Sequence, residues 1–459
     1  MKILLIHPQM EGNFFAEAKL PPLGLAFVAA ALRRAGHREI RILDANVSKN
    51  PESEIKRVLS EYSPDIAGVS LTTPLLKAAL HTARLIKSFR QDIKVIFGGV
   101  HPTLFPRDMA EQESVDYVVF GEGERTIGEL ADCLLQDKEP EGILGVAFKK
   151  GGRVIMNAPR PLIENLDTLP HPAYDLLPFS KYRDPLASHT PCTTMITSRG
   201  CPFRCIFCDT GVVLGKKYRA HSAPRVFEEM MVLSRKFGIK EIMFKESEFT
   251  LDQERVSELC RLLIREKAKV TWSCNGHVGR MKFSMLEDMR RAGCRLIQYG
   301  VESGDQKILD ILKKGTTISE IIETFEMTRK AGLKTVANLM IGNPGESRES
   351  ISQTIALTKR IKADFANIQI LTPFPGTELY QMAVQNGWFQ DGLDLAGLRS
   401  DTFVMNATAL TTDELRGMFK KMYRSFYLRP SYILNRMMTL NRHVWKMNLL
   451  GLLKLAGLS

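Results

Sequence analysis

Short apolar runs alternate with amphipathic stretches through the first third of the chain. The runs have the length and β-rich composition of buried strands, and they cover residues 2–6, 39–44, 65–71, 94–99 and 115–121. Between the first two runs, LGLAFVAAALRRAG places apolar residues at helical spacing and ends on a glycine, as helices often do. Continuous apolar strands that alternate with helices predict an α/β fold with a doubly wound parallel sheet.

The same alternation returns in the second half of the chain. Helical stretches separate the strand candidates, which cover residues 193–198, 239–244, 269–274, 295–303, 334–342 and 365–373. Six strand–helix units in succession predict a partial (β/α)6 barrel, whose active site is expected at the carboxyl ends of its strands. Between the two alternating regions, residues 158–182 contain five prolines, which predicts an extended connector.

A chain of 459 residues is too long for a single core. The pattern divides it into a doubly wound domain, a Pro-rich connector, a partial barrel and a small helical, basic C-terminal region. The predicted boundaries are 1–150, 151–189, 190–388 and 389–459.

Composition and charge narrow the class of protein. Hydrophobic residues make up 44% of the chain, as in ordinary globular proteins, and no apolar run is long enough for a transmembrane helix. The start, MKILLIHPQM, lacks a signal-peptide pattern. Eight cysteines in such a chain indicate a reducing compartment and predict a cytoplasmic protein.

The net charge of +12 is concentrated near the C-terminus, where residues 411–459 hold nine basic and two acidic residues. Aromatic and aliphatic residues are mixed with these charges. The segment therefore predicts either a helical cap on the barrel or an interfacial helix in peripheral contact with a membrane. We expect no nucleic-acid partner, because no recognition motif accompanies the charge.

Gly, Thr and His residues collect where strands of the first domain end, in SLTTP (70–74), GGVHPT (98–103) and GEGE (121–124). Ligands of doubly wound sheets bind beyond the carboxyl ends of the strands. Glycine at these turns lets a bulky ligand approach the backbone. The sequence therefore predicts a ligand site at this edge.

Three cysteines, Cys201, Cys205 and Cys208, lie in the loop SRGCPFRCIFCDT after the first barrel strand. Iron–sulfur clusters and structural zinc sites both usually have four protein ligands. The nearest further candidates are Cys192 and His221. One alternative is a zinc ion held by three Cys and one His. The other is an iron–sulfur cluster with one iron left open for a small molecule.

The C-x3-C-x2-C spacing, with Phe207 before the last cysteine and a six-unit partial barrel around it, resembles the radical SAM superfamily. The resemblance implies that Cys201, Cys205 and Cys208 hold a [4Fe–4S] cluster and that Phe207 contacts the cofactor. It also implies that the amino and carboxylate groups of S-adenosylmethionine (SAM) chelate the open iron, and that an electron from the cluster yields a 5′-deoxyadenosyl radical.

Further motifs resemble the subgroup with an N-terminal, Rossmann-like cobalamin-binding domain. They are LDTLPHPAYDLLP (166–178), YGVESGD (299–305), MIGNPGES (340–347) and LTPFPGTELY (371–380), together with PPLGLAFVAAALRRAGH (21–37) and the strand ends named above. The resemblance covers roughly residues 1 to 430. The cobalamin-contacting residues that it implies are Gly24, Thr72, Thr73, Gly98, Gly99, His101, Thr103, Gly121, Glu122 and Gly123. The cobalt-ligating D-x-H-x-x-G string is absent, so we expect no imidazole on the lower face of the cobalt.

The same resemblance implies the SAM-binding residues. Glu246 and Glu248, in KESEFT, occupy the position where relatives bind the SAM amino group, and Lys245 is a candidate ion-pair partner for one of them. Glu302 and Ser303 end the fourth barrel strand, and we expect them to contact SAM. His277 and Arg280 are weaker candidates for SAM or substrate.

The resemblance implies a cobalamin-dependent radical SAM enzyme that methylates an unactivated carbon, with methylcobalamin as the methyl donor. The alternative within the family is an oxidative cyclase, or another C–H functionalisation without methyl transfer. A non-catalytic corrinoid or iron–sulfur sensor is an alternative of a different class. Expected partners are a small, hydrophobic substrate and an electron donor such as flavodoxin or ferredoxin. The two domain mouths are expected to face each other across a shared, dry cavity.

Overall fold

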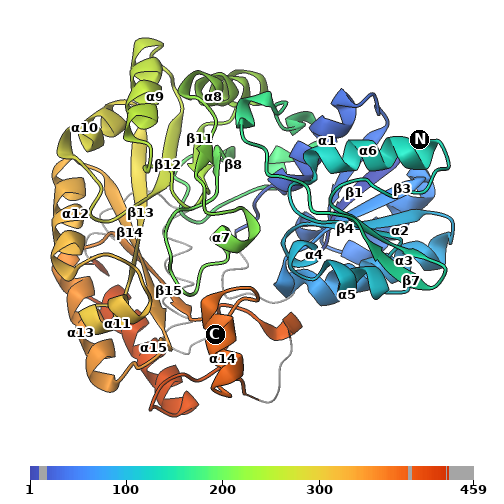
Figure 1. Ribbon diagram of the computed structural model, residues 1–459. Coiled ribbons are helices and arrows are strands. Elements are labelled where there is room, and N and C mark those ends of the chain that lie inside the picture. Colours follow the sequence, from blue (N-terminus) through green and yellow to red (C-terminus); the bar gives the residue numbers. More distant parts are fainter. Residues whose placement is uncertain (10–17, 391–394, 431, 434–459) are drawn as a thin grey trace.

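The computed structural model describes residues 1–9, 18–390, 395–430 and 432–433, which form two α/β domains side by side (Figure 1). The N-terminal domain contains a seven-stranded sheet, and the second domain contains a six-stranded sheet. A segment without long helices or strands joins them. The predicted fold class is confirmed.

The N-terminal sheet has the order β2-β1-β3-β4-β5-β6-β7. The first five strands are parallel, as predicted, and β6 and β7 add an antiparallel hairpin at one edge. Gly151 and Gly152, both with positive φ, form the turn of this hairpin. The strands are β1 (Ile3–His7), β2 (Ile40–Asp44), β3 (Ile66–Ser70), β4 (Lys94–Gly98), β5 (Tyr117–Val119), β6 (Val146–Lys150) and β7 (Arg153–Met156).

Helices cover both faces of this sheet, each with its own apolar core. Side chains of α1 and α6 pack on one face, and those of α2, α3 and α5 pack on the other. Apolar residues of these short strands, such as Leu4 and Ile6, are fully buried between the sheet and the helices. The helices are α1 (Leu23–Arg34), α2 (Pro51–Tyr62), α3 (Leu76–Phe89), α4 (Val100–Leu104), α5 (Pro106–Glu111) and α6 (Gly123–Leu135).

The second sheet has the order β8-β11-β12-β13-β14-β15, and all neighbouring strands are parallel. Figure 1 shows it curled, with helices on its outer side, as a partial barrel requires. The strands are β8 (Cys192–Met195), β11 (Glu241–Phe244), β12 (Thr271–Gly276), β13 (Cys294–Glu302), β14 (Lys334–Ile341) and β15 (Phe365–Ile370). A small antiparallel pair, β9 (Ser198–Arg199) and β10 (Arg219–Ala220), borders the cysteine loop.

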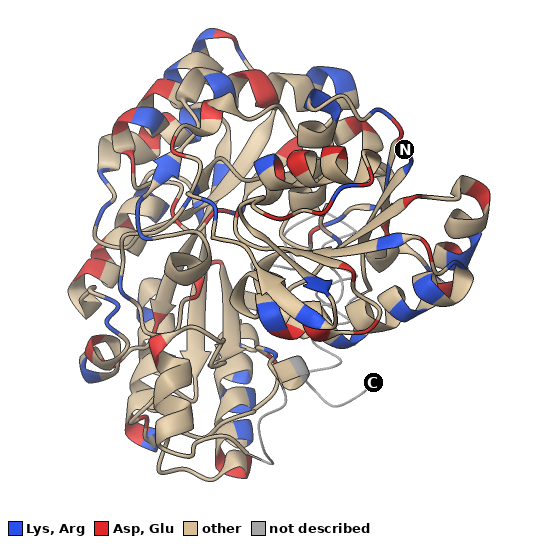
Figure 2. Ribbon diagram, turned by 45° about the vertical axis from the view of Figure 1, so that its right-hand side comes forward, with Lys and Arg blue, Asp and Glu red and all other residues tan. Residues whose placement is uncertain are grey.

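Helices follow the barrel strands in turn, and charges of both signs are interspersed over the outer helices of both domains (Figure 2). The helices are α7 (Thr210–Val213), α8 (Ala223–Phe237), α9 (Gln253–Arg265), α10 (Phe283–Arg291), α11 (Gln306–Ile311), α12 (Ile318–Lys330), α13 (Arg348–Ile361) and α14 (Glu378–Gln385).

The connector packs against both domains. The first residues of the predicted connector form β7 of the N-terminal sheet, and the part after β7 contains only 3-10 turns, at Leu166–Thr168, Tyr174–Leu176 and Phe179–Lys181. Tyr174 and Leu177 join the barrel core together with Leu23 and Ala26 of α1. The connector and α1 therefore fix the two domains against each other.

In the basic C-terminal region, a 3-10 turn at Leu395–Gly397 and an irregular segment precede a helix, α15 (Thr412–Tyr427), that caps the barrel. The hydroxyl of Tyr423 donates to the Ile368 carbonyl at 3.0 Å, and that of Tyr427 donates to the Ala366 carbonyl at 2.6 Å, so α15 lies along the edge strand β15. The predicted interfacial segment continues into residues 434–459, which lie outside the described residues. Among the helices described here, none is long and apolar enough to cross a membrane.

Candidate active site

Cys201, Cys205 and Cys208 lie in one loop between β9 and α7, at the carboxyl end of β8. Gly200 leads into the loop with a φ of +79°, and a Cβ at this position would collide with the Lys217 carbonyl. The amide of Cys201 donates to the Gly215 carbonyl at 3.2 Å, which fixes the start of the loop. All three thiols are free, without disulfide bonds.

The spacing of these thiols argues against a single zinc ion. Within the described part of the chain, no three His, Cys, Asp or Glu side chains are close enough to hold one metal ion. His221 instead places Nδ1 3.1 Å from Asp167 Oδ1, and Cys192 begins β8, at the far end of that strand. A zinc site of three Cys and one His is therefore not formed among the described residues.

A buried ion pair lies beside the cysteine loop. Lys314 Nζ is 2.9 Å from Glu302 Oε1, and the two side chains are 13% and 9% exposed. Burial works against the charge on Lys314, but the neighbouring carboxylates of Glu302 and Glu248 and the Cys205 sulfur outweigh it, so the pKa of Lys314 is raised. Lys314 was not predicted as a site residue, since its only signal in the sequence is its place in LKKG, shortly after the VES motif.

Glu302 takes an unusual backbone conformation. Its φ is +61°, and the register between β13 and β14 shifts between Gly300 and Glu302. A Cβ at Gly300 would lie only 2.5 Å from Lys314 Nζ. The bulge and the glycine therefore direct the Glu302 carboxylate toward the lysine.

Glu246 and Glu248 have different surroundings. The Thr197 hydroxyl contacts Glu246 Oε1, and Arg255 Nη1 donates to Thr197 Oγ1 at 3.1 Å. Burial raises the pKa of Glu248 to about 7, although Lys314 and Arg280 oppose the rise. Glu248 Oε2 is buried without a hydrogen-bond partner among the described residues. Of the two, Glu248 thus lies among the charges beside the cysteine loop.

Three further candidates have well-defined protein contacts. His277 stacks on Phe203 of the cysteine loop at 4.2 Å between ring centroids, and Arg280 lies over the same ring at 5.2 Å. Ser303 Oγ is 3.3 Å from Thr354 Oγ1 and is fully buried. These residues hold the loop and the strand end in place. Phe207 packs against the apolar cluster of Ile206.

Lys245 does not pair with Glu246 or Glu248, so that expectation was wrong. Its Nζ lies 3.2 Å from Asp184 Oδ2 in the connector. Consecutive residues after a strand point to opposite sides, which takes Lys245 away from the glutamate that follows it.

The predicted cobalamin residues converge at the carboxyl ends of β3, β4 and β5. Thr103 Oγ1 accepts from the Gly121 amide at 3.0 Å and donates to the Gly99 carbonyl at 2.7 Å. Gly99 has a φ of +104°, and a Cβ there would lie 2.8 Å from the Leu71 carbonyl. Thr72 and Thr73 follow β3, Gly98 ends β4, and Gly123 begins α6. Gly121 and Gly24, the second residue of α1, border open space.

The two largest side chains of this set, His101 and Glu122, have partners inside the protein, as Thr103 does. His101 Nδ1 is 3.1 Å from Thr73 Oγ1, and burial lowers the pKa of His101 to about 4. Its imidazole packs against Phe105. The Glu122 carboxylate binds Arg199 and Arg219 of the other domain. A direct cofactor contact by either side chain stays a prediction.

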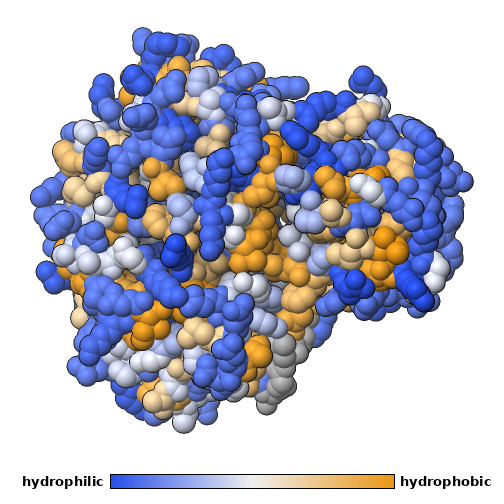
Figure 3. All heavy atoms as spheres, viewed as in Figure 1, coloured by the Kyte–Doolittle hydropathy of each residue, from blue (hydrophilic) through white to orange (hydrophobic). Residues whose placement is uncertain are grey.

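The two strand-end regions meet at the domain junction. Helices α4, after β4, and α7, after Cys208, are in contact. A Cβ at Gly376, after β15, would lie 2.9 Å from Val212 of α7 and 3.3 Å from Leu104 of α4. Figure 3 shows a band of apolar residues between the two domains. The expected facing of the two domain mouths is therefore present in the fold.

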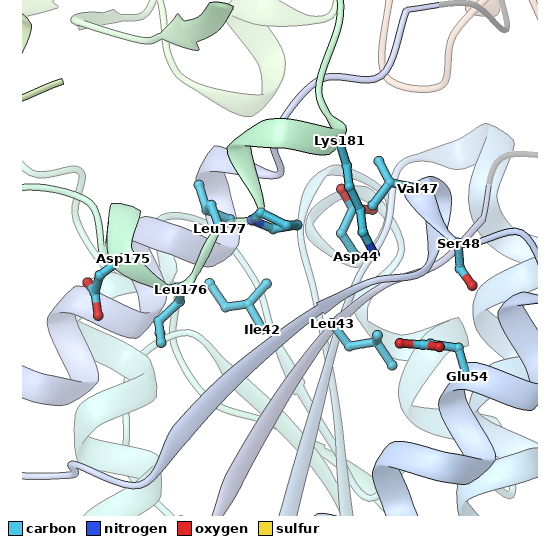
Figure 4. A pocket seen from close by; sticks show the side chains of 11 residues that line it. Ile42, Leu43, Asp44, Val47, Ser48, Glu54, Asp175, Leu176, Leu177 and Lys181 are labelled. Atoms are coloured by element: carbon cyan, nitrogen blue, oxygen red, sulfur yellow. The ribbon is translucent and has the colours of Figure 1, made fainter. Parts of the chain in front are cut away.

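A separate pocket of about 330 Å³ lies between the edge strand β2 and the connector (Figure 4). Its lining includes Asp44, Val47, Leu177 and Lys181. Burial raises the pKa of Asp44 to about 6. None of the residues proposed for the cofactors lines this pocket.

Comparison with known proteins defines the class of this fold and site. The chain matches the model of the Radical SAM superfamily over residues 195–358 and that of the B12 binding domain over residues 16–131. An uncharacterized methyltransferase of Pyrococcus horikoshii is 35% identical over 99% of this chain and 98% of its own length. The chain therefore belongs to the cobalamin-dependent radical SAM enzymes, and its cofactors are a [4Fe–4S] cluster, SAM and cobalamin.

Two more distant relatives extend the comparison. The anaerobic magnesium-protoporphyrin IX monomethyl ester cyclase of Rubrivivax gelatinosus is 26% identical over 94% of this chain and 78% of its own. The radical SAM methyltransferase TsrM from Kitasatospora setae, solved with cobalamin and a [4Fe–4S] cluster, has a TM-score of 0.71 at 20% identity. That match covers 86% of this chain and 77% of the other. It supports the fold.

Proposed function

We propose that this enzyme transfers a methyl group to an unactivated carbon of a small, apolar substrate. The observation that carries the proposal is the full-length similarity to a methyltransferase, joined with two cofactor regions that face each other. When bound, the cluster supplies an electron for the cleavage of SAM, and cobalamin supplies the methyl group. The protein binds and orients both and excludes competing reactions.

In this proposal Cys201, Cys205 and Cys208 hold the cluster. Glu248 and Lys314 hold SAM, since a buried carboxylate and a buried ammonium beside the loop complement the two charged groups of its methionine part. Glu302 keeps Lys314 charged through their ion pair. The backbone around Gly98, Gly99, Gly121 and Gly123 borders the cobalamin.

The band of apolar residues at the junction supports an apolar substrate. Val212, next to the cysteine loop, is 46% exposed despite its apolar side chain. Apolar walls exclude water, which protects radical chemistry from unwanted hydrogen donors. Peripheral membrane contact through the basic C-terminal region would fit a lipid-like substrate, and flavodoxin or ferredoxin would fit the need for an electron donor in the cytoplasm.

The test is a product analysis. The protein is reconstituted anaerobically with iron, sulfide and cobalamin, and incubated with SAM, a reductant and candidate substrates. A methyltransferase of the proposed kind yields both 5′-deoxyadenosine and S-adenosylhomocysteine. Neither product from a fully loaded enzyme would contradict the proposal and favour a sensor.

The second candidate is an oxidative cyclase, which the similarity to the Rubrivivax gelatinosus cyclase favours. The same cofactors and residues would serve it. It predicts 5′-deoxyadenosine without S-adenosylhomocysteine, so the same experiment separates the two functions.

A further inference from the structure

Glu122 of the N-terminal domain binds two arginines of the barrel domain. Its Oε1 accepts from Arg199 at 3.0 Å and from Arg219 at 2.9 Å, and its Oε2 accepts from Arg219 at 3.0 Å and from the Ile163 amide at 2.6 Å. Arg199 also pairs with Glu124. None of the four charged side chains is more than 11% exposed.

The two arginines need this carboxylate. Arg199 and Arg219 are direct partners across the antiparallel pair β9–β10. Like charges that face each other across such a pair repel, and a buried charge without a partner is costly. Glu122 lies between them and offsets both effects. Glu122 therefore stabilises the β9–β10 pair by binding both arginines at once.

Each side of this contact leads directly to a cofactor region. On one side, Arg199 is followed by Gly200 and Cys201, the first cluster ligand. On the other, Glu122 stands between Gly121 and Gly123, and Thr103 fixes Gly121. Only one or two residues separate the ion contacts from either region.

We propose that the Glu122–Arg199–Arg219 contact couples the two cofactor sites, so that filling one changes the other. Cluster binding restrains Cys201 and with it the β9–β10 pair. That pair holds Glu122, and so orders the loop predicted to border cobalamin. Coupling of this kind is reciprocal. The proposal rests on the presence of both cofactors and is independent of methyl transfer.

The test compares hydroxocobalamin affinity of the full chain with and without a reconstituted cluster, by absorbance titration. For the wild type we expect the cluster to tighten cobalamin binding about fivefold or more. For Glu122→Gln the two affinities should be equal. Glu129→Gln is the matched control, because Glu129 lies on α6, which begins directly after Glu122, and its half-exposed carboxylate pairs with Arg160. It should keep the wild-type ratio.

A spectroscopic measurement separates coupling from a merely structural role. The samples are kept under excess dithionite, because a reduced cluster would otherwise pass its electron to the cobalt of hydroxocobalamin. Under this condition, adding cobalamin should change the g-values of the reduced cluster in the electron paramagnetic resonance spectrum of the wild type and leave them unchanged in Glu122→Gln. If Glu122→Gln does not fold, Arg199→Lys takes its place. This variant keeps the buried charge, loses one of the two ion contacts, and should show a smaller ratio.

A wild-type ratio of one would overturn the coupling, and so would a Glu122→Gln protein with the wild-type ratio and spectral change. A wild type that binds no cobalamin at all would overturn the two-cofactor assignment as well. No step of this experiment measures methyl transfer. A failed methylation assay would therefore contradict the proposed function without changing the result of the coupling test.

Discussion

At the scale of single residues, the charged side chains beside the cysteine loop come from distant parts of the chain. The spacing of the cysteines predicts the loop itself but not these neighbours. Lys314 lies more than a hundred residues after the loop in the sequence, and only the curl of the sheet brings it beside Cys205 and Glu248. A lone lysine in LKKG carries no signal of its own. The distinction between Glu246 and Glu248 also needed the structure, because it depends on Thr197 and Arg255.

Cys205→Ala should lose the cluster, because the variant leaves only two of the three thiolates that the loop supplies as ligands. We expect iron and sulfide content after anaerobic reconstitution to fall to background. Cys133→Ala is the control, since Cys133 lies on α6 in the other domain, and should keep wild-type content. Full iron loading of Cys205→Ala would contradict the ligand assignment.

Lys314→Gln should weaken SAM binding, because the side chain keeps a polar group but loses the buried charge. We expect the SAM dissociation constant to rise about 10-fold to 100-fold, the cost of about 1.4–2.8 kcal/mol for one charge-assisted contact. The adjacent Lys313 pairs with Glu378 at the surface. Lys313→Gln should bind SAM as the wild type does, measured by calorimetry, and equal weakening in both variants would refute the role of Lys314.

Asp44 should make stability depend on pH. Its pKa is about 6 in the folded protein, against 3.8 ordinarily, so the folded protein holds a proton that the unfolded chain releases between these values. The stabilising effect of this proton is complete below about pH 4 and is lost as the pH rises through about 6. Asp44→Asn should therefore gain thermal stability relative to the wild type between about pH 4 and about pH 7, by about 1–3 kcal/mol. A difference in melting temperature between Asp44→Asn and the wild type that does not change with pH would contradict this. Asp92→Asn is the control, because Asp92 is exposed.

At the scale of elements, the period of the apolar residues was enough to place most strands and helices. All five parallel strands of the first sheet and all six of the barrel coincide with apolar runs in the sequence. The β6–β7 hairpin was not predicted because VAFKK and RVIM are short and carry charged residues, although Gly151–Gly152 between them is a turn signal. The β9–β10 pair was not predicted, because a strand of two residues is too short to show a period of apolar residues.

The C-terminal helix α15 should contribute strongly to the stability of the barrel. Phe426 is fully buried among barrel side chains. Phe426→Ala should cost about 3–5 kcal/mol, through lost burial and a cavity, and lower the melting temperature clearly. Lys420→Ala, at an exposed position of the same helix, should change it little. A small effect of Phe426→Ala would mean that α15 is not part of the barrel's cooperative unit.

At the scale of the whole molecule, the sequence predicted two domains and a connector, but not the side-chain contacts across the domain junction. The residues that meet there lie far apart in the chain: the arginines of β9 and β10 with the carboxylate of Glu122, and helix α4 with helix α7. Their meeting places a predicted cobalamin edge opposite a cysteine loop. This arrangement, more than either domain alone, is what two cooperating cofactors require.

The most direct test of this account needs no substrate. The reconstituted enzyme, with reduced cobalamin bound, is given SAM that carries a trideuterated methyl group, and the corrinoid is recovered and weighed by mass spectrometry. Methyl transfer predicts a trideuteromethyl group on the corrinoid and one S-adenosylhomocysteine for each. A fully loaded enzyme that leaves the corrinoid unlabelled would contradict the account.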